Sequence, residues 1–291
     1  MIGGEVLRAV SSDGVELAVV QSGDRARPAV VLIHGYPDTK ELWSGAIDRL
    51  RDRFHVIAYD VRGAGESDVP RSVAAYDFSL LGDDLLAVVD ASAPGRSIHL
   101  VGHDWGALQG WEFATQPRFR DRLRSFTAIA GPSLDQVAMS GGSLLRRGRL
   151  VEAVRRGWRS WYIVPLLTPG GPRLMAQLML RGGGPPGAQP SLARDAVNEA
   201  NLYRRNIPRR MVRPRVDAVA HVPVQLIVPR GDRYISESYY ELAERYAPGL
   251  RRRTVDGPHW LPRTDPELVA RLIAEHVEEV EASLGATARA S

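Results

Sequence analysis

VGHDWGAL, residues 101–108, joins an apolar run, SIHL, to a helix-like stretch, ALQGWEFAT. Asp104 stands at its centre, between Gly102 and Gly106. This spacing of small residues around one polar residue is typical of a sharp turn from a strand into a helix, which pushes one side chain into a pocket. Most turns of this kind carry serine. The carboxylate therefore raises the question of which chemistry needs an acid at this place.

Runs rich in β-branched residues recur on both sides of this turn. Their composition predicts strands within residues 15–23, 28–35, 55–63, 97–104, 123–131, 223–232 and 251–257. Several of these runs are almost continuously apolar, as parallel strands covered on both faces are. Helical patterns separate them, at residues 41–53, 78–92, 107–116, 236–246 and 266–284. The alternation predicts an α/β fold with a doubly wound, mostly parallel sheet, and residues 285–291 are expected to form a frayed tail or the start of a linker.

The alternation stops after Gly131 and resumes at Pro223. In between, apolar residues recur at helical spacing with arginines on the opposite side. Residues 133–216 hold 15 arginines and 4 acidic residues, a local charge of +11, whereas the whole chain has a net charge of +4. We therefore expect a mostly helical cap, residues 133–216, inserted into a core formed by residues 1–132 and 217–291.

The composition is that of a soluble globular protein, with 44% hydrophobic and 25% charged residues. The chain has no cysteine, which excludes disulfides and a thiolate nucleophile. No apolar run approaches the roughly 20 residues that span a bilayer, and the N-terminal stretch MIGGEVLRAV lacks the pattern of a signal peptide. We expect a cytoplasmic protein that uses neither a cofactor nor a metal ion.

Three polar side chains follow predicted strands in the order carboxylate, carboxylate, histidine: Asp104, Asp232 and His259. Nucleophile, acid and histidine occur in this order in α/β-hydrolases, and the carboxyl ends of parallel strands bring such residues to one edge of the sheet. Asp135, after the run at 123–131, is the alternative acid, and we favour Asp232.

A carboxylate nucleophile suits substitution at carbon better than acyl transfer. Asp104, near its ordinary pKa of about 3.9, is already ionised and needs no base before it attacks. Attack on an ester would form an anhydride, whereas attack on a saturated electrophilic carbon forms an alkyl ester that water can cleave. The sequence therefore indicates an epoxide or an alkyl halide as substrate.

His259 would take a proton from the water that cleaves this ester, while Asp232 orients the imidazole and stabilises its charged form. Ester cleavage passes through an oxyanion that needs backbone N–H donors, and we assign these to Tyr36 and Trp105. The residues expected to contact the substrate are His34, Pro37, Trp158 and Trp161.

Five ordered motifs resemble the epoxide hydrolases of the α/β-hydrolase superfamily: HGYP at 34–37, DVRGAGES at 60–67, GHDWGA at 102–107, RGDRYIS at 230–236 and GPHWLP at 257–262. The resemblance covers nearly the whole chain. It implies an α/β-hydrolase fold, with an eight-stranded, mostly parallel sheet flanked by helices and an inserted helical cap. The chain also resembles the hydrolase half of bacterial proteins in which a short-chain dehydrogenase follows.

Epoxide hydrolases of this family hold and protonate the epoxide oxygen with two cap tyrosines. By resemblance, Tyr162 in SWYIVPLL and Tyr203 in NLYRRN have these roles, with Leu202 where a tryptophan is common. A phenol with a pKa of about 10 can protonate an alkoxide without being ionised at neutral pH. The resemblance thus implies that a lipophilic epoxide is opened to a vicinal diol through an ester of Asp104, which water activated by His259 then hydrolyses.

Two other functions stay open. A haloalkane or haloacid dehalogenase would use the same Asp104 and stabilise the leaving halide with indole N–H groups, for which Trp105 with Trp158 or Trp161 are candidates. Against this, Tyr36 stands where haloalkane dehalogenases commonly have Asn, and Trp105 where fluoroacetate dehalogenases have Arg. A non-catalytic ligand-binding protein on the same scaffold is the third hypothesis.

The arginines of the predicted cap form two clusters, six within 146–159 and six within 204–215. The simpler interpretation is a solvated face with ion pairs from cap to core. The alternative is that the rim of the cap attracts substrates that carry a carboxylate, or contacts an anionic membrane surface. We expect no nucleic acid as partner, because no reader motif accompanies the arginines.

Overall fold

The computed structural model describes residues 2–146, 148, 151, 160–181, 185–187 and 189–290. Its centre is an eight-stranded sheet with the order β1-β2-β4-β3-β5-β6-β7-β8. β2 is antiparallel to both of its neighbours, and all the other pairs are parallel. The strands are β1 (Glu5–Val10), β2 (Glu16–Ser22), β3 (Ala29–Ile33), β4 (His55–Tyr59), β5 (Ile98–His103), β6 (Leu123–Ile129), β7 (Val224–Pro229) and β8 (Arg251–Val255).

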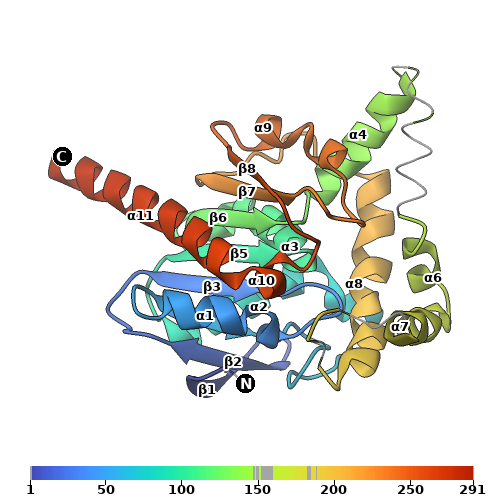
Figure 1. Cartoon of the computed structure of the whole chain (residues 1–291), viewed down its shortest axis with the longest axis horizontal. Helices are drawn as coiled ribbons and strands as arrows, with labels where there is room; N and C mark the ends of the chain where they lie inside the picture. Colours follow the sequence, from blue (N-terminus) through green and yellow to red (C-terminus); the bar gives the residue numbers. More distant parts are fainter. Residues whose placement is uncertain are drawn as a thin grey trace.

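Helices cover both faces of the sheet, which is why its central strands are apolar without alternation. In β3 the side chains of Val30 and Leu32 join one hydrophobic cluster, and those of Val31 and Ile33 join the other, since successive side chains of a strand point to opposite faces. α1 (Ser44–Leu50) and α11 (Pro266–Ala290) pack on the first face. α2 (Phe78–Ser92) and α3 (Trp105–Ala114) pack on the second (Figure 1).

The chain between β6 and β7 is helical in the part that the structure describes. Its helices are α4 (Leu134–Arg146), α6 (Ile163–Leu167), α7 (Gly171–Arg181) and α8 (Leu192–Val212). α8 is the long helix of this group and contacts α4, α6 and α7, and Figure 1 shows it standing beside the sheet. The boundaries predicted from the sequence, after residues 132 and 216, fall in the connections that flank these helices.

The arginines within 204–215 are largely engaged in ion pairs between the cap helices and the rest of the protein. Arg205 and Arg209 each bind Asp77, which precedes α2, at 2.8 and 2.9 Å. Arg210 and Arg215 both lie 2.8 Å from Glu112 of α3. These contacts agree with the ion-pair interpretation. The arginine side chains within 146–159 lie outside the described residues.

The predicted elements are found with four main differences, one of which is that the helix predicted at 41–53 is divided into η1 (Lys40–Trp43) and α1 (Ser44–Leu50). The edge strand β1 was not among the predicted strands. The helix predicted at 236–246 is split into a 3-10 turn, η4 (Glu237–Tyr240), and one turn of helix, α9 (Ala243–Tyr246). α11 continues to Ala290, so the predicted tail is helical. The remaining short helices are η2 (Val73–Tyr76), η3 (Pro117–Phe119) and α10 (Leu261–Thr264).

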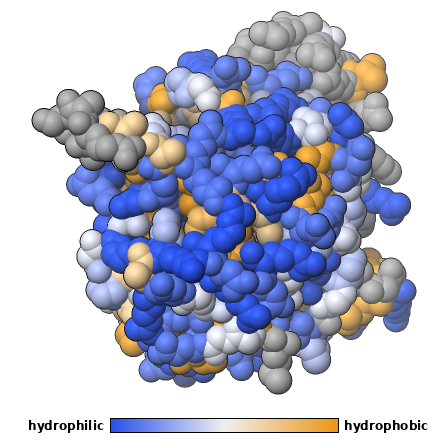
Figure 2. Space-filling view, turned by 60° about the vertical axis from the view of Figure 1, so that its left-hand side comes forward, coloured by the Kyte–Doolittle hydropathy of each residue, from blue (hydrophilic) through white to orange (hydrophobic). Residues whose placement is uncertain are grey.

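One face of the molecule is mainly polar (Figure 2). On the face shown in Figure 2, hydrophilic residues dominate and hydrophobic ones gather in small patches. None of the described helices combines the length and the apolar character that crossing a membrane requires.

Candidate active site

Asp104 occupies a strained turn between β5 and α3. Its backbone has φ 51° and ψ −117°, a conformation that residues other than glycine rarely adopt. Glycine is needed on either side because the chain passes so closely: a Cβ at Gly102 would lie 2.3 Å from the carbonyl carbon of Gly106, and one at Gly106 would lie 2.2 Å from the oxygen of Ile33. The sequence around Asp104 thus forms the predicted sharp turn, with the carboxylate facing a pocket.

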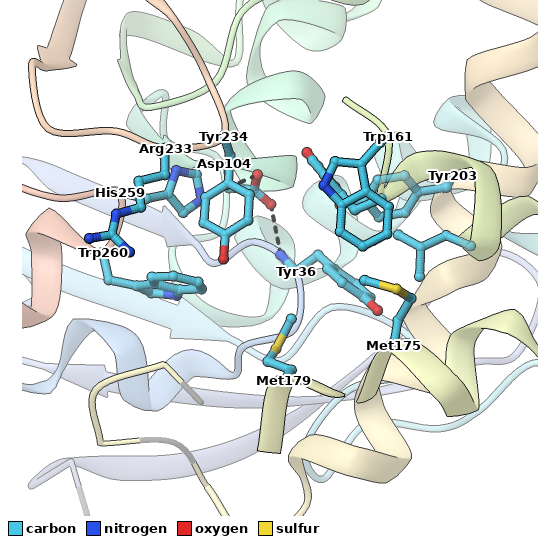
Figure 3. A pocket seen from close by; sticks show the side chains of 12 residues that line it. Tyr36, Asp104, Trp161, Met175, Met179, Tyr203, Arg233, Tyr234, His259 and Trp260 are labelled. Carbon is cyan, nitrogen blue, oxygen red and sulfur yellow. Dashed lines mark hydrogen bonds and ion pairs between the residues drawn. The ribbon is translucent and has the colours of Figure 1, made fainter. Parts of the chain in front are cut away.

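The two carboxylate oxygens of Asp104 have different surroundings. Oδ1 accepts a hydrogen bond from the backbone N–H of Tyr36 at 2.8 Å, and Oδ2 lies 3.6 Å from Nε2 of His259 (Figure 3). Burial by itself would raise the pKa of Asp104, but the positive charge of His259 beside Oδ2, together with the hydrogen bond from Tyr36, outweighs it and holds the pKa below its ordinary value. Asp104 is therefore an ionised carboxylate whose Oδ2 is turned toward the histidine.

His259 is held between two carboxylates. Its Nδ1 lies 2.8 Å from Oδ2 of Asp232, and the other oxygen of Asp232 accepts the backbone N–H groups of Tyr234 and Ile235 at 2.7 and 2.9 Å. Burial favours the neutral imidazole, but the charges of Asp232 and Asp104 outweigh it and raise the pKa of His259 to about 10. The resting site thus holds an imidazolium between two carboxylates.

Asp135 does not take part in this arrangement. It lies at the start of α4, where Arg210 and Arg215 bind its carboxylate at 3.1 and 2.8 Å. Of the two acids considered from the sequence, Asp232 is the one that contacts His259.

Two other histidines near the site support its backbone. Nε2 of His103 donates a hydrogen bond to the backbone oxygen of His259 at 2.9 Å. Burial lowers the pKa of His103 to about 4, so its ring stays neutral. His34 is fully buried, and its Nε2 accepts the N–H of Val61 at 2.9 Å. The prediction that His34 and Pro37 contact the substrate is not supported, because neither lines the pocket: the ring of His34 is used to join the ends of β3 and β4.

The two predicted tyrosines reach the pocket from the cap. Tyr203, on α8, is only 3% exposed and packs edge-on against Tyr36 with 5.0 Å between ring centres. Its ring centre also lies 4.7 Å from that of Trp105. Tyr162, just before α6, is partly buried and packs against Tyr234 at 5.5 Å. Burial and the charge of Asp104 raise the pKa of both phenols, so both stay protonated at neutral pH.

A cavity of about 390 Å³ joins these groups, within the usual size range of ligand pockets. Figure 3 shows side chains from the sheet edge and from the cap converging on it. Among the described residues it is lined by Tyr36, Asp104, Trp161, Tyr162, Leu166, Met175, Met179, Tyr203, Arg233, Tyr234, His259 and Trp260. Trp161 therefore lines the pocket as predicted, and Trp158 lies outside the described residues.

Sequence analysis did not identify several of the lining residues. Tyr234 and Trp260 lie within two positions of Asp232 and His259, inside motifs that had been recognised, so their closeness to the site could have been inferred. Met175 and Met179 are four residues apart on one face of α7 and belong to no motif. Within the described residues, no group of three or more His, Cys, Asp or Glu side chains is arranged to hold a metal ion.

A carboxylate on a strained turn after β5, an acid after β7 and a histidine after β8, all at one edge of a mostly parallel sheet, define the α/β-hydrolase arrangement. A family model described as alpha/beta hydrolase fold matches residues 28–266. The chain belongs to this family. The predicted fold class is thereby confirmed.

Two curated relatives come from Mycobacterium tuberculosis. The protein named probable oxidoreductase EphD is 33% identical over 291 aligned residues, which cover 92% of this chain and 48% of EphD. Epoxide hydrolase A is 32% identical over 202 residues, which cover 66% of this chain and 60% of that enzyme. This chain thus spans about half the length of EphD.

Solved structures of epoxide hydrolases have the same fold. A mutant of the Bacillus megaterium enzyme, crystallised with its naphthyloxy-propanediol product, superposes with a TM-score of 0.75 at 20% identity, over 94% of this chain and 100% of the other. An epoxide hydrolase from metagenomes of hot environments superposes with a TM-score of 0.74 at 22% identity, over 93% of this chain and 97% of the other.

Proposed function

We propose that this protein is an epoxide hydrolase that opens an epoxide to a vicinal diol through a covalent ester of Asp104. The observation that carries the proposal is the shared pocket: an ionised carboxylate next to a histidine–acid pair, with two protonated phenols, Tyr162 and Tyr203, on the cap side. The similarity to proteins named epoxide hydrolase supports the same activity.

The first half-reaction is the opening of the ring. Oδ2 of Asp104 is the attacking oxygen, because Oδ1 is held by the N–H of Tyr36. As the new bond from Oδ2 to carbon forms, the bond from that carbon to the ring oxygen breaks, and the ring oxygen takes a proton from Tyr162 or Tyr203. The product of this step is a hydroxyalkyl ester of Asp104 and one tyrosinate.

The second half-reaction is the hydrolysis of that ester. His259 takes a proton from a water molecule, and the resulting hydroxide adds to the carboxyl carbon of Asp104. The N–H of Tyr36, and by the sequence prediction also that of Trp105, stabilises the oxyanion that forms. The intermediate then collapses, releases the diol and restores the carboxylate, and the proton taken from water stays on His259, which is again the imidazolium of the resting site.

Alkylation of Asp104 itself prepares His259 for the second step. In the resting site the imidazole is protonated, because Asp104 and Asp232 raise its pKa to about 10. Once Asp104 is a neutral ester, one of these charges is gone, so the pKa of His259 falls. The ring can then pass its proton to the tyrosinate and act as a base. The order of the two half-reactions is thus built into the charges of the site.

A dehalogenase would need N–H donors for the leaving halide. The side chain of Trp105, the first candidate for this role, is not among the residues that line the described pocket, whereas Trp161, the second candidate, is. The described pocket thus offers one of the two indoles that a halide site would use but both phenols, Tyr162 and Tyr203, that an epoxide site needs, and phenols suit an alkoxide that must be protonated.

Single-turnover reaction in heavy-oxygen water tests the covalent mechanism. With enzyme in excess over styrene oxide, the water oxygen should stay on Asp104, because the diol leaves with an original carboxylate oxygen. Mass spectrometry of the active-site peptide and of the diol locates the label. Label in the first-turnover diol would show direct attack by water, and faster release of halide from alkyl halides than of diol from epoxides would favour the dehalogenase.

A second test separates the two half-reactions. His259→Gln should still allow Oδ2 of Asp104 to attack but should stop hydrolysis, so the protein should gain the mass of one substrate molecule. A variant that folds and binds the substrate but forms no adduct would mean either that His259 has another role or that Asp104 is not the nucleophile.

A further inference from the structure

Arg233 is a cationic residue in the wall of the candidate active site that the proposed mechanism does not use. It follows Asp232 directly, is exposed, and lines the same pocket as Asp104 and His259. Figure 3 shows it on the side of the pocket where His259 and Trp260 lie, across from Trp161.

The guanidinium of Arg233 has no acidic partner among the described residues, whereas neighbouring arginines do. Arg230, three residues earlier, binds Asp256 at 2.9 Å, and Arg263 binds Asp38. Arg233 is not needed to hold the catalytic acid either, because Asp232 is already bonded to His259 and to two backbone N–H groups. The side chain therefore meets the pocket with its charge unneutralised by any described carboxylate.

The opposite wall of the pocket is apolar. Leu166, Met175, Met179 and Trp161 line it from α6, α7 and the chain before α6. A ligand that fills this space would place a hydrophobic part against the cap and could place a negatively charged group against Arg233. A guanidinium is suited to this, because its planar set of donors binds a carboxylate with two parallel hydrogen bonds.

We propose that Arg233 binds a carboxylate on the substrate, so that the site prefers epoxides whose apolar body ends in an acid. The inference rests on the proposed function, since it names the class of epoxide that the site takes. It differs from the attraction by cap arginines considered from the sequence: the group responsible is one core residue inside the pocket wall, and the arginines at 204–215 are largely paired.

The test compares isosteric substrates that differ in charge alone: para-(glycidyloxy)benzoate and its primary amide, and the epoxide of undecylenic acid and its primary amide. The wild-type protein should turn over each acid with a higher kcat/KM than its amide. Arg233→Gln should lower kcat/KM for the acids by about ten-fold or more, mainly through KM, as loss of a charge-assisted hydrogen bond does. It should change the value for the amides by less than about two-fold.

Arg230→Gln is the matched control. Arg230 is also exposed and lies in the same motif, but its guanidinium is bound by Asp256 and it does not line the pocket. This variant should leave the ratio of acid to amide at the wild-type value. Arg233→Glu should invert the preference, because it places a like charge against the acid.

A readout without turnover keeps the inference separate from the proposed function. Isothermal calorimetry measures the affinity of the Asp104→Asn variant for the two acids and for their amides. The ratio of these affinities gives the preference for a charged substrate even if the protein opens no epoxide. Acid and amide bound equally, or an equal loss for both in Arg233→Gln, would overturn the role of Arg233. A protein that binds the acids through Arg233 but opens neither these acids nor styrene oxide would instead overturn the proposed function.

Discussion

At the scale of single residues, Asp104 and His259 control each other's protonation. The carboxylate of Asp104 helps to raise the pKa of His259 to about 10, and the imidazolium in turn lowers the pKa of Asp104. Such coupling has a direct consequence for stability. Since the pKa of His259 in the folded protein lies above its ordinary value of 6.5, the stabilisation from its charge is present in full below about pH 6.5 and is lost as the pH rises toward 10.

The first prediction concerns this coupling. Asp104→Asn replaces the carboxylate by a neutral group, as alkylation does, and should lower the pKa of His259 because only Asp232 then remains beside it. Titration of the histidine side chains by NMR measures the shift, and comparison with His259→Gln assigns the signal. Asp256→Asn, at an exposed carboxylate bound by Arg230, should leave it unchanged. An equal pKa of His259 in the Asp104→Asn variant and the wild type would contradict the proposed preparation of the base.

The second prediction concerns the cap tyrosines. Tyr162→Phe and Tyr203→Phe should each slow ring opening by about 100- to 10,000-fold, the usual effect of losing a general acid. Tyr246→Phe is the control, because its buried hydroxyl has no partner among the described residues and lies away from the pocket. Stopped-flow measurement of ester formation isolates the step. Full activity of both single variants would assign protonation to another group.

The predictable residues of the site are those whose chemistry depends on the local chain. Asp104 could be recognised because a sharp turn needs glycines at fixed distances from the nucleophile, and His259 and Asp232 because they follow strands. Arg233 follows Asp232 directly, so its closeness to the site could be inferred, but its place in the pocket wall, like that of Met179, depends on which side chains the cap leaves uncovered above the sheet edge. That arrangement comes from packing between distant segments and has no local pattern.

At the scale of elements, the same distinction separates α2 from β1. The helix α2 begins and ends where its apolar periodicity predicts, at Phe78 and Ser92, with Asp77 capping its first turn. β1 is an edge strand whose side chains are mostly exposed, so its sequence has neither the apolar run nor the alternation of a buried strand. β1 pairs with β2 through backbone hydrogen bonds, and the pattern of its side chains does not predict this pairing.

The helix α8 carries a buried acid at the interface between cap and core. Glu199 is fully buried, its two carboxylate oxygens have no hydrogen-bond partner among the described residues, and the nearest cationic candidate is Nδ1 of His34 at 3.9 Å. Burial, and then the charges of Asp195, Asp38 and other carboxylates, raise its pKa well above the ordinary 4.5. Glu199 is therefore held in the interface in its protonated form.

The third prediction follows from the raised pKa of Glu199. The folded protein binds this proton more tightly than the unfolded chain, so the stability linked to it is complete below about pH 4.5 and declines as the pH rises through the folded-state pKa. Glu199→Gln keeps the shape of the neutral acid without titrating. The variant should unfold at higher urea concentration than the wild type near pH 8, with a difference that shrinks toward pH 5. Glu244→Gln, at an exposed position, is the control. A difference independent of pH would contradict the assignment.

At the scale of the whole molecule, ion pairs between the basic cap and the acidic core hold the cap on the core. The sequence showed a basic segment in a chain whose remainder is acidic, but it could not show which arginines have partners. The structure pairs Arg205 and Arg209 with Asp77, and Arg210 with Glu112, across the boundary. These pairs position α8, and with it Tyr203, over the end of the sheet.

The last prediction concerns Asp135 of the cap, which is 1% exposed and binds Arg210 and Arg215, the two arginines that also reach Glu112 of the core. Asp135→Asn should lower the free energy of unfolding by about 2 to 3 kcal/mol, because it leaves partly buried guanidinium groups short of a counter-charge. Asp256→Asn, which breaks an exposed pair, should cost less than about 1 kcal/mol. Urea unfolding measures both. Because Asp232 and not Asp135 contacts His259, the folded Asp135→Asn protein should keep its rate of diol formation, and a loss of ester hydrolysis without a loss of stability would return Asp135 to the role of catalytic acid.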